Sequence, residues 1–153
     1  MHALYERFLL EYFKSHHPQL VPSAPRVPWD LGEGQHVHSQ LPAMSTDLVL
    51  RKGNKRLVVD AKYYSQPLAQ GRHGKRTVRS DHLYQILAYA KNLDVDQDGT
   101  VAGLLLYAKT DDKEHPNLEV TIQGTRIAAN TLDLSAPWEH LADQLNRIPQ
   151  RLS

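Results

Sequence analysis

The chain has 153 residues and a net charge of +1, so any surface that binds nucleic acid must be a local patch. It contains no cysteine, which excludes a disulfide framework, a thiolate metal site and a cysteine nucleophile. Hydrophobic residues make up 41% of the sequence and charged residues 23%, as in ordinary globular proteins. The sequence has no apolar run long enough to span a membrane and no signal-peptide pattern, so we expect a cytoplasmic protein with a single domain over residues 1–153.

The chain begins with a predicted helix and a long irregular connection. Apolar and aromatic side chains recur at helical spacing over residues 3–16. Glu6 lies beside this apolar stripe, whereas Glu11 lies well away from its centre. Residues 17–34 contain four prolines and two glycines, which favour an irregular connection. Residues 35–41 alternate in the manner of a short strand.

Residues 47–62 predict a β-hairpin. Two apolar runs flank Gly53–Asn54, a pair that suits a tight two-residue turn. If Lys52 faces Lys55 across this turn, the numbers of paired residues sum to 107. One face of the hairpin is then wholly apolar, and we expect it to meet the core.

The opposite face of this hairpin carries three charged side chains. In the predicted register Asp47 faces Asp60, and Lys62 lies two residues further along the same face. Like charges directly opposite each other are destabilising, so we expect Asp60→Asn to leave the metal-free chain at least as stable as the wild type. A divalent cation would remove the repulsion, and oxygen ligands at this spacing suit Mg²⁺ or Mn²⁺. The alternative interpretation is an exposed sheet face with scattered charges.

Asp47 at the opening of one strand and Asp60-Ala61-Lys62 in the next resemble the active-site motif of the PD-(D/E)XK nuclease superfamily. Three longer stretches are similar to the nuclease domain of McrC-like subunits from McrBC methylation-dependent restriction systems. These stretches are residues 41–47, 57–64 and 83–89, and the resemblance covers about residues 3–110. One departure is that Pro42 does not immediately precede Asp47.

The resemblance implies a restriction-endonuclease-like α/β core, a mixed β-sheet flanked by helices. It implies Mg²⁺-dependent hydrolysis of phosphodiester bonds in DNA, with Mn²⁺ able to replace Mg²⁺. Asp47 and Asp60 would hold the metal, with Glu6 from the first helix and the backbone carbonyl of Ala61 as further ligands. Lys62 would position the attacking water or stabilise charge on the phosphate.

A basic segment follows the hairpin. Residues 65–80 carry four cationic side chains with two glycines and no acidic residue before Asp81, which predicts a flexible segment. Its position suits contacts with phosphates, although such charge runs are usually solvated loops. The residues expected to bind nucleic acid are Tyr63, Arg72, Lys75, Arg76 and Arg79.

A second helix is predicted over residues 81–92, with Ser80 as its N-cap. Its buried stripe is expected to consist of Leu83, Ile86, Leu87 and Ala90. Gln85 and Tyr89 lie one turn apart on another side, together with His82. They resemble the Gln-x-x-x-Tyr element that supports the active site of RecB-like nucleases, and the alternative is an ordinary polar helix flank.

The rest of the chain predicts strands and a final helix. Residues 94–99 predict a turn, and residues 101–109 form an apolar run typical of a buried strand. Two further strands are expected at 118–123 and 125–133. A last helix opens at 135–137, with four side chains predicted to face inward, which are Trp138, Leu141, Leu145 and Ile148.

The resemblance also implies a partner, a GTP-hydrolysing AAA+ motor subunit. The chain itself has no Gly-rich phosphate loop ending in Gly-Lys-Ser/Thr, so it is not a P-loop motor. It begins almost at the first nuclease helix, which suggests an excised domain or a reduced stand-alone protein. Two alternatives stay open, a non-catalytic nucleic-acid-binding module on a nuclease fold and a nuclease that acts on RNA or branched DNA.

Overall fold

The computed structural model describes residues 2–153, and their elements follow the predicted succession of helix, strands, helix, strands and helix. The helices are α1 (His2–His16), α2 (Ser80–Leu93) and α3 (Trp138–Arg147), with short 3-10 turns η1 (Pro18–Leu20), η2 (Arg72–Gly74) and η3 (Ile148–Leu152). The strands are β1 (Arg26–Val27), β2 (Met44–Ser45), β3 (Leu48–Lys52), β4 (Lys55–Lys62), β5 (Leu68–Gln70), β6 (Arg76–Val78), β7 (Val101–Ala108), β8 (Leu118–Ile122) and β9 (Thr125–Leu132).

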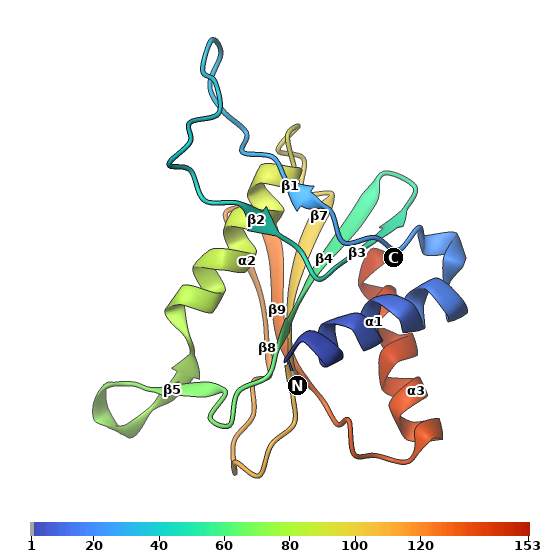
Figure 1. Ribbon diagram of the computed structural model, residues 1–153. Coiled ribbons are helices and arrows are strands. Elements are labelled where there is room, and N and C mark those ends of the chain that lie inside the picture. The colour runs from blue at the N-terminus through green and yellow to red at the C-terminus, as the bar shows by residue number, and fades with distance from the viewer. Residues whose placement is uncertain (1) are drawn as a thin grey trace.

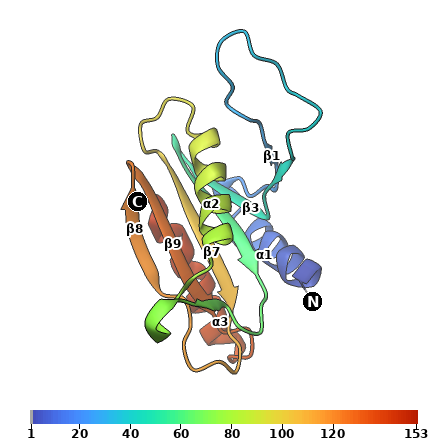
Figure 2. The same ribbon diagram turned by 90° about the vertical axis from the view of Figure 1, so that its left-hand side faces the viewer.

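A five-stranded mixed sheet forms the centre of the molecule, in the order β3-β4-β7-β9-β8. The pairs β4–β7 and β7–β9 are parallel, whereas β3–β4 and β8–β9 are antiparallel hairpins. Helix α2 lies on one face of this sheet, and α1 and α3 lie on the other (Figures 1 and 2). The α/β restriction-endonuclease-like core that the sequence predicts is therefore confirmed.

Both faces of the sheet are buried by these helices. The apolar face of the β3–β4 hairpin packs into a core with α1 and α3, as predicted from the alternation of its side chains. On the other face, α2 packs Ile86, Tyr89 and Ala90 against the central strand β7. All eight residues of β7 are buried, as expected for a parallel strand covered on both sides.

The β3–β4 register confirms the predicted sum of 107. Leu48 pairs with Val59, and Lys52 pairs with Lys55 at the turn. Gly53 has a φ of 61°, a conformation that the first central residue of a tight hairpin turn requires. This register brings Asp47 opposite Asp60, one position beyond the last paired residues of the ladder.

Several expectations for the connecting segments are wrong. Residues 35–41 form no strand, because they lie in a projecting and largely exposed loop where their backbone meets no partner strand (Figure 1). The segment 65–80, in which no regular element was predicted, contains a small hairpin of β5 and β6. Trp138 is 54% exposed because it is the first residue of α3, whereas Leu141, Leu145 and Ile148 are buried as predicted.

The second helix also differs from its prediction in detail. It begins at Ser80 itself, and Arg79 is the N-cap without a side-chain hydrogen bond. His82 and Tyr89 are buried, whereas Leu83 and Leu87 are only partly buried. The stripe that faces the sheet is therefore rotated toward the polar residues, because α2 packs over the charged end of the hairpin as well as over β7.

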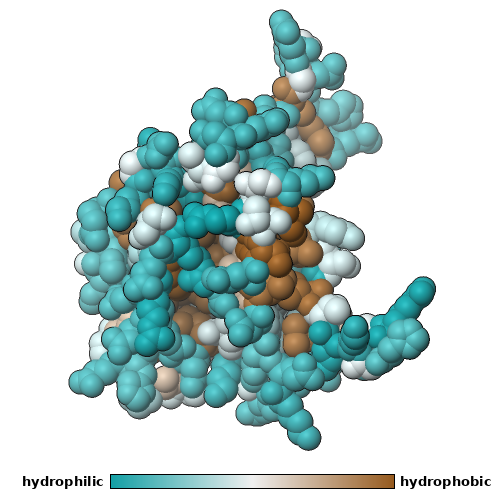
Figure 3. Space-filling model, turned by 180° about the vertical axis from the view of Figure 1, so that it is seen from behind, coloured by the Kyte–Doolittle hydropathy of each residue, from teal (hydrophilic) through white to brown (hydrophobic). Residues whose placement is uncertain are grey.

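Strand β8 forms one edge of the sheet. Its apolar side chains Leu118 and Ile122 are partly buried against the core below α2, and Val120 is 37% exposed. The rear view shows a patch of exposed apolar side chains surrounded by polar ones (Figure 3). Within residues 2–153, none of the helices is both long and apolar enough to cross a membrane.

Candidate active site

The three charged residues of the hairpin meet where β3 begins and β4 ends. Asp60 and Lys62 lie at the C-terminal end of β4, where they pair with Leu105 and Tyr107 of β7. Only 4% of Asp60 and 6% of Lys62 is exposed, since α2 covers this end of the strand. The alternative of an exposed sheet face with scattered charges is therefore wrong.

Asp47 lies in an environment that disfavours its charge. Burial, and then the negative charge of Asp60, raise the pKa of Asp47 to about 8, with a smaller contribution from Glu6. The backbone N–H of Ala61 opposes this shift, since it donates a hydrogen bond of 2.7 Å to Asp47 Oδ2. The Asp47 carboxyl group therefore retains most of its proton near neutral pH.

Asp60 is held instead by a cation. Lys62 Nζ lies 2.6 Å from Asp60 Oδ2, and both side chains are almost fully buried. The contact is an ion pair without the angular geometry of a hydrogen bond, so Oδ2 has no hydrogen-bond partner within the described chain. A buried carboxylate oxygen with an unused lone pair is available to a further ligand.

The Lys62 ammonium is fixed by two residues of α2. It donates a hydrogen bond of 2.7 Å to Gln85 Oε1, and Gln85 Nε2 donates one of 3.0 Å to the hydroxyl of Tyr89. Gln85 and Tyr89, one helical turn apart, are thus joined by a hydrogen bond. Tyr89 sets the orientation of the Gln85 amide, and the amide oxygen in turn faces Lys62.

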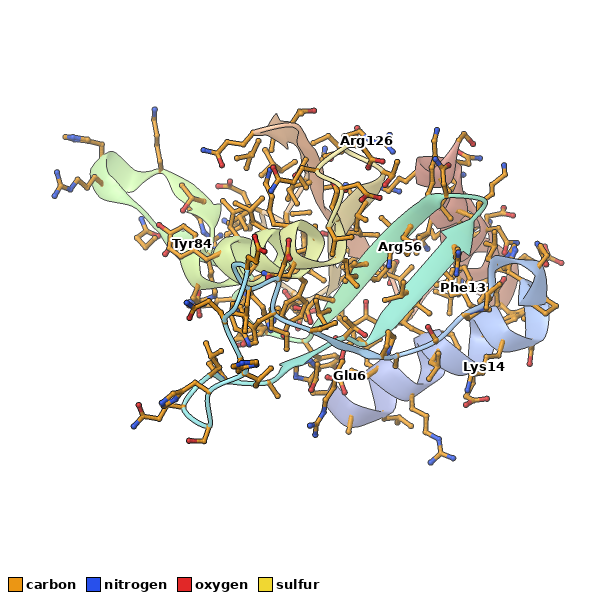
Figure 4. The ribbon with its side chains drawn as sticks, turned by 90° about the horizontal axis from the view of Figure 1, so that it is seen from above. Glu6, Phe13, Lys14, Arg56, Tyr84 and Arg126 are labelled. Atoms are coloured by element: carbon orange, nitrogen blue, oxygen red, sulfur yellow. The ribbon has the colours of Figure 1, made fainter. Side chains whose placement is uncertain are left out.

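The first helix brings two further groups to this place. Glu6 is partly buried and its charge reaches Asp47, whereas Glu11 is exposed. The Nε2 atom of His2 lies 2.7 Å from the carbonyl oxygen of Ala61 and 3.3 Å from Glu6 Oε1. The same nitrogen of His2 therefore contacts both the Glu6 carboxylate and the Ala61 carbonyl. Figure 4 shows Glu6 at the beginning of α1, beside this end of the hairpin.

The residues present fit a hard divalent cation. The unpartnered Asp60 Oδ2, the Asp47 carboxyl and the Ala61 carbonyl offer oxygen donors, with Glu6 nearby. Over residues 2–153, no three or more histidine, cysteine, aspartate or glutamate side chains are grouped closely enough to hold a metal ion, so the Asp47 and Asp60 carboxyl groups are not joined by a third such side chain. Mg²⁺ commonly binds through one or two carboxylates and keeps several waters, so a partial set of this kind suits Mg²⁺ or Mn²⁺ better than zinc.

The basic segment is divided between exposed and engaged cations. Arg72 and Lys75 lie exposed at the tip of the β5–β6 hairpin. Arg76 forms a bidentate pair with Asp112 in the loop after β7, and this pair lowers the pKa of Asp112 to about 2. Arg79 donates to the carbonyl of Gln66 and lies 5.5 Å from the centre of the Tyr64 ring.

Tyr63 lies at the boundary between the site and α1. Its ring meets Tyr5 edge-on, with the ring centres 6.3 Å apart, and 39% of the residue is exposed. Tyr63 therefore has an exposed surface next to the candidate site. Of the four predicted cations, only Arg72 and Lys75 are exposed.

Sequence reasoning missed three contacts around the site. His2 was placed outside the predicted helix, and only its contacts with Glu6 and Ala61 draw attention to it. His82 Nδ1 lies 2.8 Å from the buried hydroxyl of Tyr107, and burial lowers the pKa of His82. The parallel pairing of β4 with β7 is the signal for Tyr107, since the register places it beside Lys62.

These features define an α/β chain with a restriction-endonuclease-like core, in which one hairpin brings two aspartates and a lysine together. The family model described as the McrBC 5-methylcytosine restriction system component matches residues 1–108. The chain therefore belongs to this family.

The chain is also similar to the Type IV methyl-directed restriction enzyme EcoKMcrBC of Escherichia coli (strain K12). The two are 29% identical over 146 residues, which cover 95% of this chain and 41% of the relative. The chain thus spans about two fifths of the length of the curated relative that it matches. The similarity extends beyond residue 108, across β8, β9 and α3, so it includes the whole sheet.

Proposed function

We propose that the chain is the nuclease component of a McrBC-like restriction system and hydrolyses phosphodiester bonds in DNA with Mg²⁺. The observation that carries this proposal is the opposed pair Asp47 and Asp60, buried beside Lys62. Two opposed carboxyl groups at such a position cost stability when both are ionised, unless a cation binds them. Membership of a restriction-system family makes DNA the favoured substrate over RNA.

In this proposal the chain supplies the metal ligands, and the cation acts as a Lewis acid. Asp47 and Asp60 would hold the metal, with the Ala61 carbonyl and Glu6 as further oxygen donors. When bound, a divalent cation activates water and offsets charge on the scissile phosphate. Mn²⁺ would serve in place of Mg²⁺, because the same oxygen donors bind both.

Lys62 has the second role in the proposed reaction. Its ammonium is positioned by Gln85, whose own amide is held by Tyr89. Fixed at this point, the charge would orient the attacking water or stabilise the negative charge that develops on the phosphate in the transition state. Because the donor is preorganised and buried, it is worth more there than a mobile surface lysine would be.

The test is a plasmid-cleavage assay with Mg²⁺, with Mn²⁺ and with EDTA. Asp60→Ala and Lys62→Ala are expected to abolish cleavage, while Asp96→Ala, an exposed residue of the turn after α2, serves as the matched control. Circular dichroism establishes that each variant is folded. Undiminished cleavage by folded Lys62→Ala would show that the lysine is not needed for the reaction. Cleavage in the presence of EDTA would show that no divalent metal is needed.

The same assay separates the alternatives. A folded wild type that binds duplex DNA without cutting it under any metal would be a binding module on a nuclease fold. Preferential cleavage of RNA or of a branched DNA junction over linear duplex would replace the proposed substrate and leave the proposed chemistry intact.

A further inference from the structure

The turn of the β3–β4 hairpin carries a dense group of cations. Four of the six residues 51–56 are positively charged and none is acidic. In the observed register Arg51 faces Arg56 and Lys52 faces Lys55. We call these four residues the basic tip. Arg51 and Lys52 are exposed, and Lys55 and Arg56 are partly buried.

The basic tip costs stability, because each of its two pairs places like charges directly opposite one another. Among residues 2–153, none of the five salt bridges involves any of the four side chains. Arg56 donates to the carbonyl of Leu93, which carries no net charge.

Nearby acidic residues do not neutralise the basic tip. The turn after α2 approaches it, since Arg56 N donates to the carbonyl of Thr100. However, Asp94 accepts hydrogen bonds from the backbone of Asp98 and Gly99, and Asp98 accepts from Thr100. These carboxylates stabilise their own turn. Four cations are therefore held together without an anionic partner among residues 2–153.

The arginine pair of the basic tip lies on the same face of the hairpin as the candidate site. Side chains alternate along a strand, so Arg56 and Asp60, four residues apart, point the same way. Their separation along β4 is about 13 Å at roughly 3.3 Å per residue. Figure 4 shows Arg56 further along the hairpin than the end where Glu6 lies. The short β1–β2 pair packs over Val49 and Val58 between the two positions.

We propose that the basic tip is a second binding site for the phosphate backbone of duplex DNA, engaged by the duplex that occupies the active site. This inference rests on the proposed function for the identity of the polyanion. A distance of about 13 Å corresponds to roughly four base-pair steps of 3.4 Å, well inside one footprint on a duplex. Phosphates at the basic tip would relieve the mutual repulsion of its arginine pair, which lies on the face of the candidate site, and hold the duplex in register over the β1–β2 pair.

The experiment replaces one member of each pair, in the variant Arg51→Gln/Lys52→Gln. This choice keeps the hydrogen bond of Arg56 to Leu93 intact. Fluorescence anisotropy with a 30-base-pair duplex in EDTA measures affinity from 50 to 300 mM salt. Losing the phosphate contact of Arg51 should reduce the slope of log affinity against log salt by about 0.9, which is a loss of roughly 8-fold at 0.1 M. Lys52, whose side chain alternates to the opposite face of the hairpin, adds at most the same again.

Thermal melting without DNA gives an independent readout. Removing both like-charged pairs should raise the melting temperature of the variant by about 1–8 °C, since each pair costs about 0.2–1 kcal/mol and each kcal/mol is about 2–4 °C at this chain length. A folded variant with weaker DNA binding and higher stability is the expected result. The matched control is Lys14→Gln/Arg147→Gln, which removes the same charge from exposed positions on α1 and α3.

Each contrary outcome has a distinct meaning. Equal salt slopes for wild type, variant and control would overturn the basic tip as a DNA site and leave the proposed function standing. A wild type that binds no duplex at 50 mM salt would overturn both. If DNA affinities are equal but poly-L-glutamate associates with the wild type and the control only, the tip binds an acidic protein surface instead, and the proposal is wrong.

Discussion

The two opposed aspartates have opposite surroundings, so their substitution should have opposite effects. Asp47 accepts a hydrogen bond from a backbone N–H, faces no cation within the described residues and carries a raised pKa. Asp60 compensates the buried ammonium of Lys62. The register alone suggested that removing either charge relieves a repulsion, but it contained no information on this ion pair.

In the metal-free protein, Asp60→Asn should lower stability rather than preserve it. The substitution leaves Lys62 buried without a counter-ion, and breaking one partner of a buried pair typically costs about 3–5 kcal/mol. For this chain length the melting temperature should fall by roughly 6–20 °C. Thermal melting in EDTA measures the change, with Asp96→Asn as an exposed control. A melting temperature equal to that of the wild type would show that the ion pair contributes nothing.

Asp47→Asn should have the opposite effect, and the effect should depend on pH. A carboxyl whose pKa is raised from its ordinary value near 3.8 to about 8 stabilises the fold below pH 4, and this stabilisation is lost as the pH rises toward 8. The variant cannot lose a proton, so its advantage over the wild type should grow between pH 4 and pH 8. After allowance for solvent screening, the difference at pH 8 is on the order of 1–2 kcal/mol. Urea unfolding at pH 5 and pH 8 in EDTA checks this, and a difference that does not change with pH contradicts it.

At the scale of elements, the position of α2 decides whether Gln85 reaches Lys62. Gly103 of β7 lies beneath this helix, and a Cβ there would approach Ile86 Cγ1 to 2.7 Å and Ile127 Cδ1 to 3.0 Å. Both side chains are buried, so neither can move without displacing its own element. The glycine is required for the close approach of helix and sheet.

Gly103→Ala should therefore reduce cleavage while leaving DNA affinity intact. The added methyl pushes α2 outward and lengthens the hydrogen bond between Lys62 and Gln85, and overpacking of this kind costs about 1–3 kcal/mol of stability. The measurements are single-turnover cleavage and duplex binding. Gly32→Ala is the matched control, because its nearest neighbour would lie at an ordinary 3.7 Å. Wild-type cleavage by Gly103→Ala would show that the spacing of α2 does not matter to the site.

The β5–β6 hairpin should bind phosphates with two of its cations rather than four. Arg72→Gln/Lys75→Gln should reduce the salt slope of duplex binding by about 1.8, because both side chains are exposed at the tip. Arg76→Gln should change the slope less, since that guanidinium is occupied by Asp112. A larger slope change for Arg76→Gln than for the double variant would mean that DNA displaces Asp112.

The sequence predicted the elements and the hairpin best because both depend on local patterns. The turn and the alternation of side chains determine the β3–β4 register, and with it the positions of Asp47 and Asp60. Contacts between distant segments were beyond such reasoning, as the pair of Arg76 with Asp112 illustrates. Helical spacing likewise could not show that α3 leaves Trp138 exposed, since periodicity gives a stripe and not the extent of its partner.

At the scale of the whole molecule, the proposed function includes a partner subunit. If the proposed function holds, a GTP-hydrolysing AAA+ subunit would drive this chain, which spans 41% of EcoKMcrBC. The sequence has no phosphate-loop motif, so the isolated chain should show no GTP hydrolysis. Its cleavage should be slow alone and increase with such a subunit and GTP. Robust cleavage that no such partner changes would indicate a nuclease that works by itself.

Because the pKa of Asp47 is raised, metal binding at the proposed site would be coupled to the release of a proton. Near pH 7 the carboxyl retains most of its proton, and a cation that takes this position must release it to the solvent. The apparent affinity for Mg²⁺ would then increase by up to tenfold for each unit by which the pH is raised, until the pH reaches about 8. The heat of binding would include the ionisation enthalpy of the buffer, so a titration in phosphate and one in Tris would report different enthalpies for one event. The difference between the two binding enthalpies, divided by the difference between the ionisation enthalpies of the buffers, would give the number of protons released.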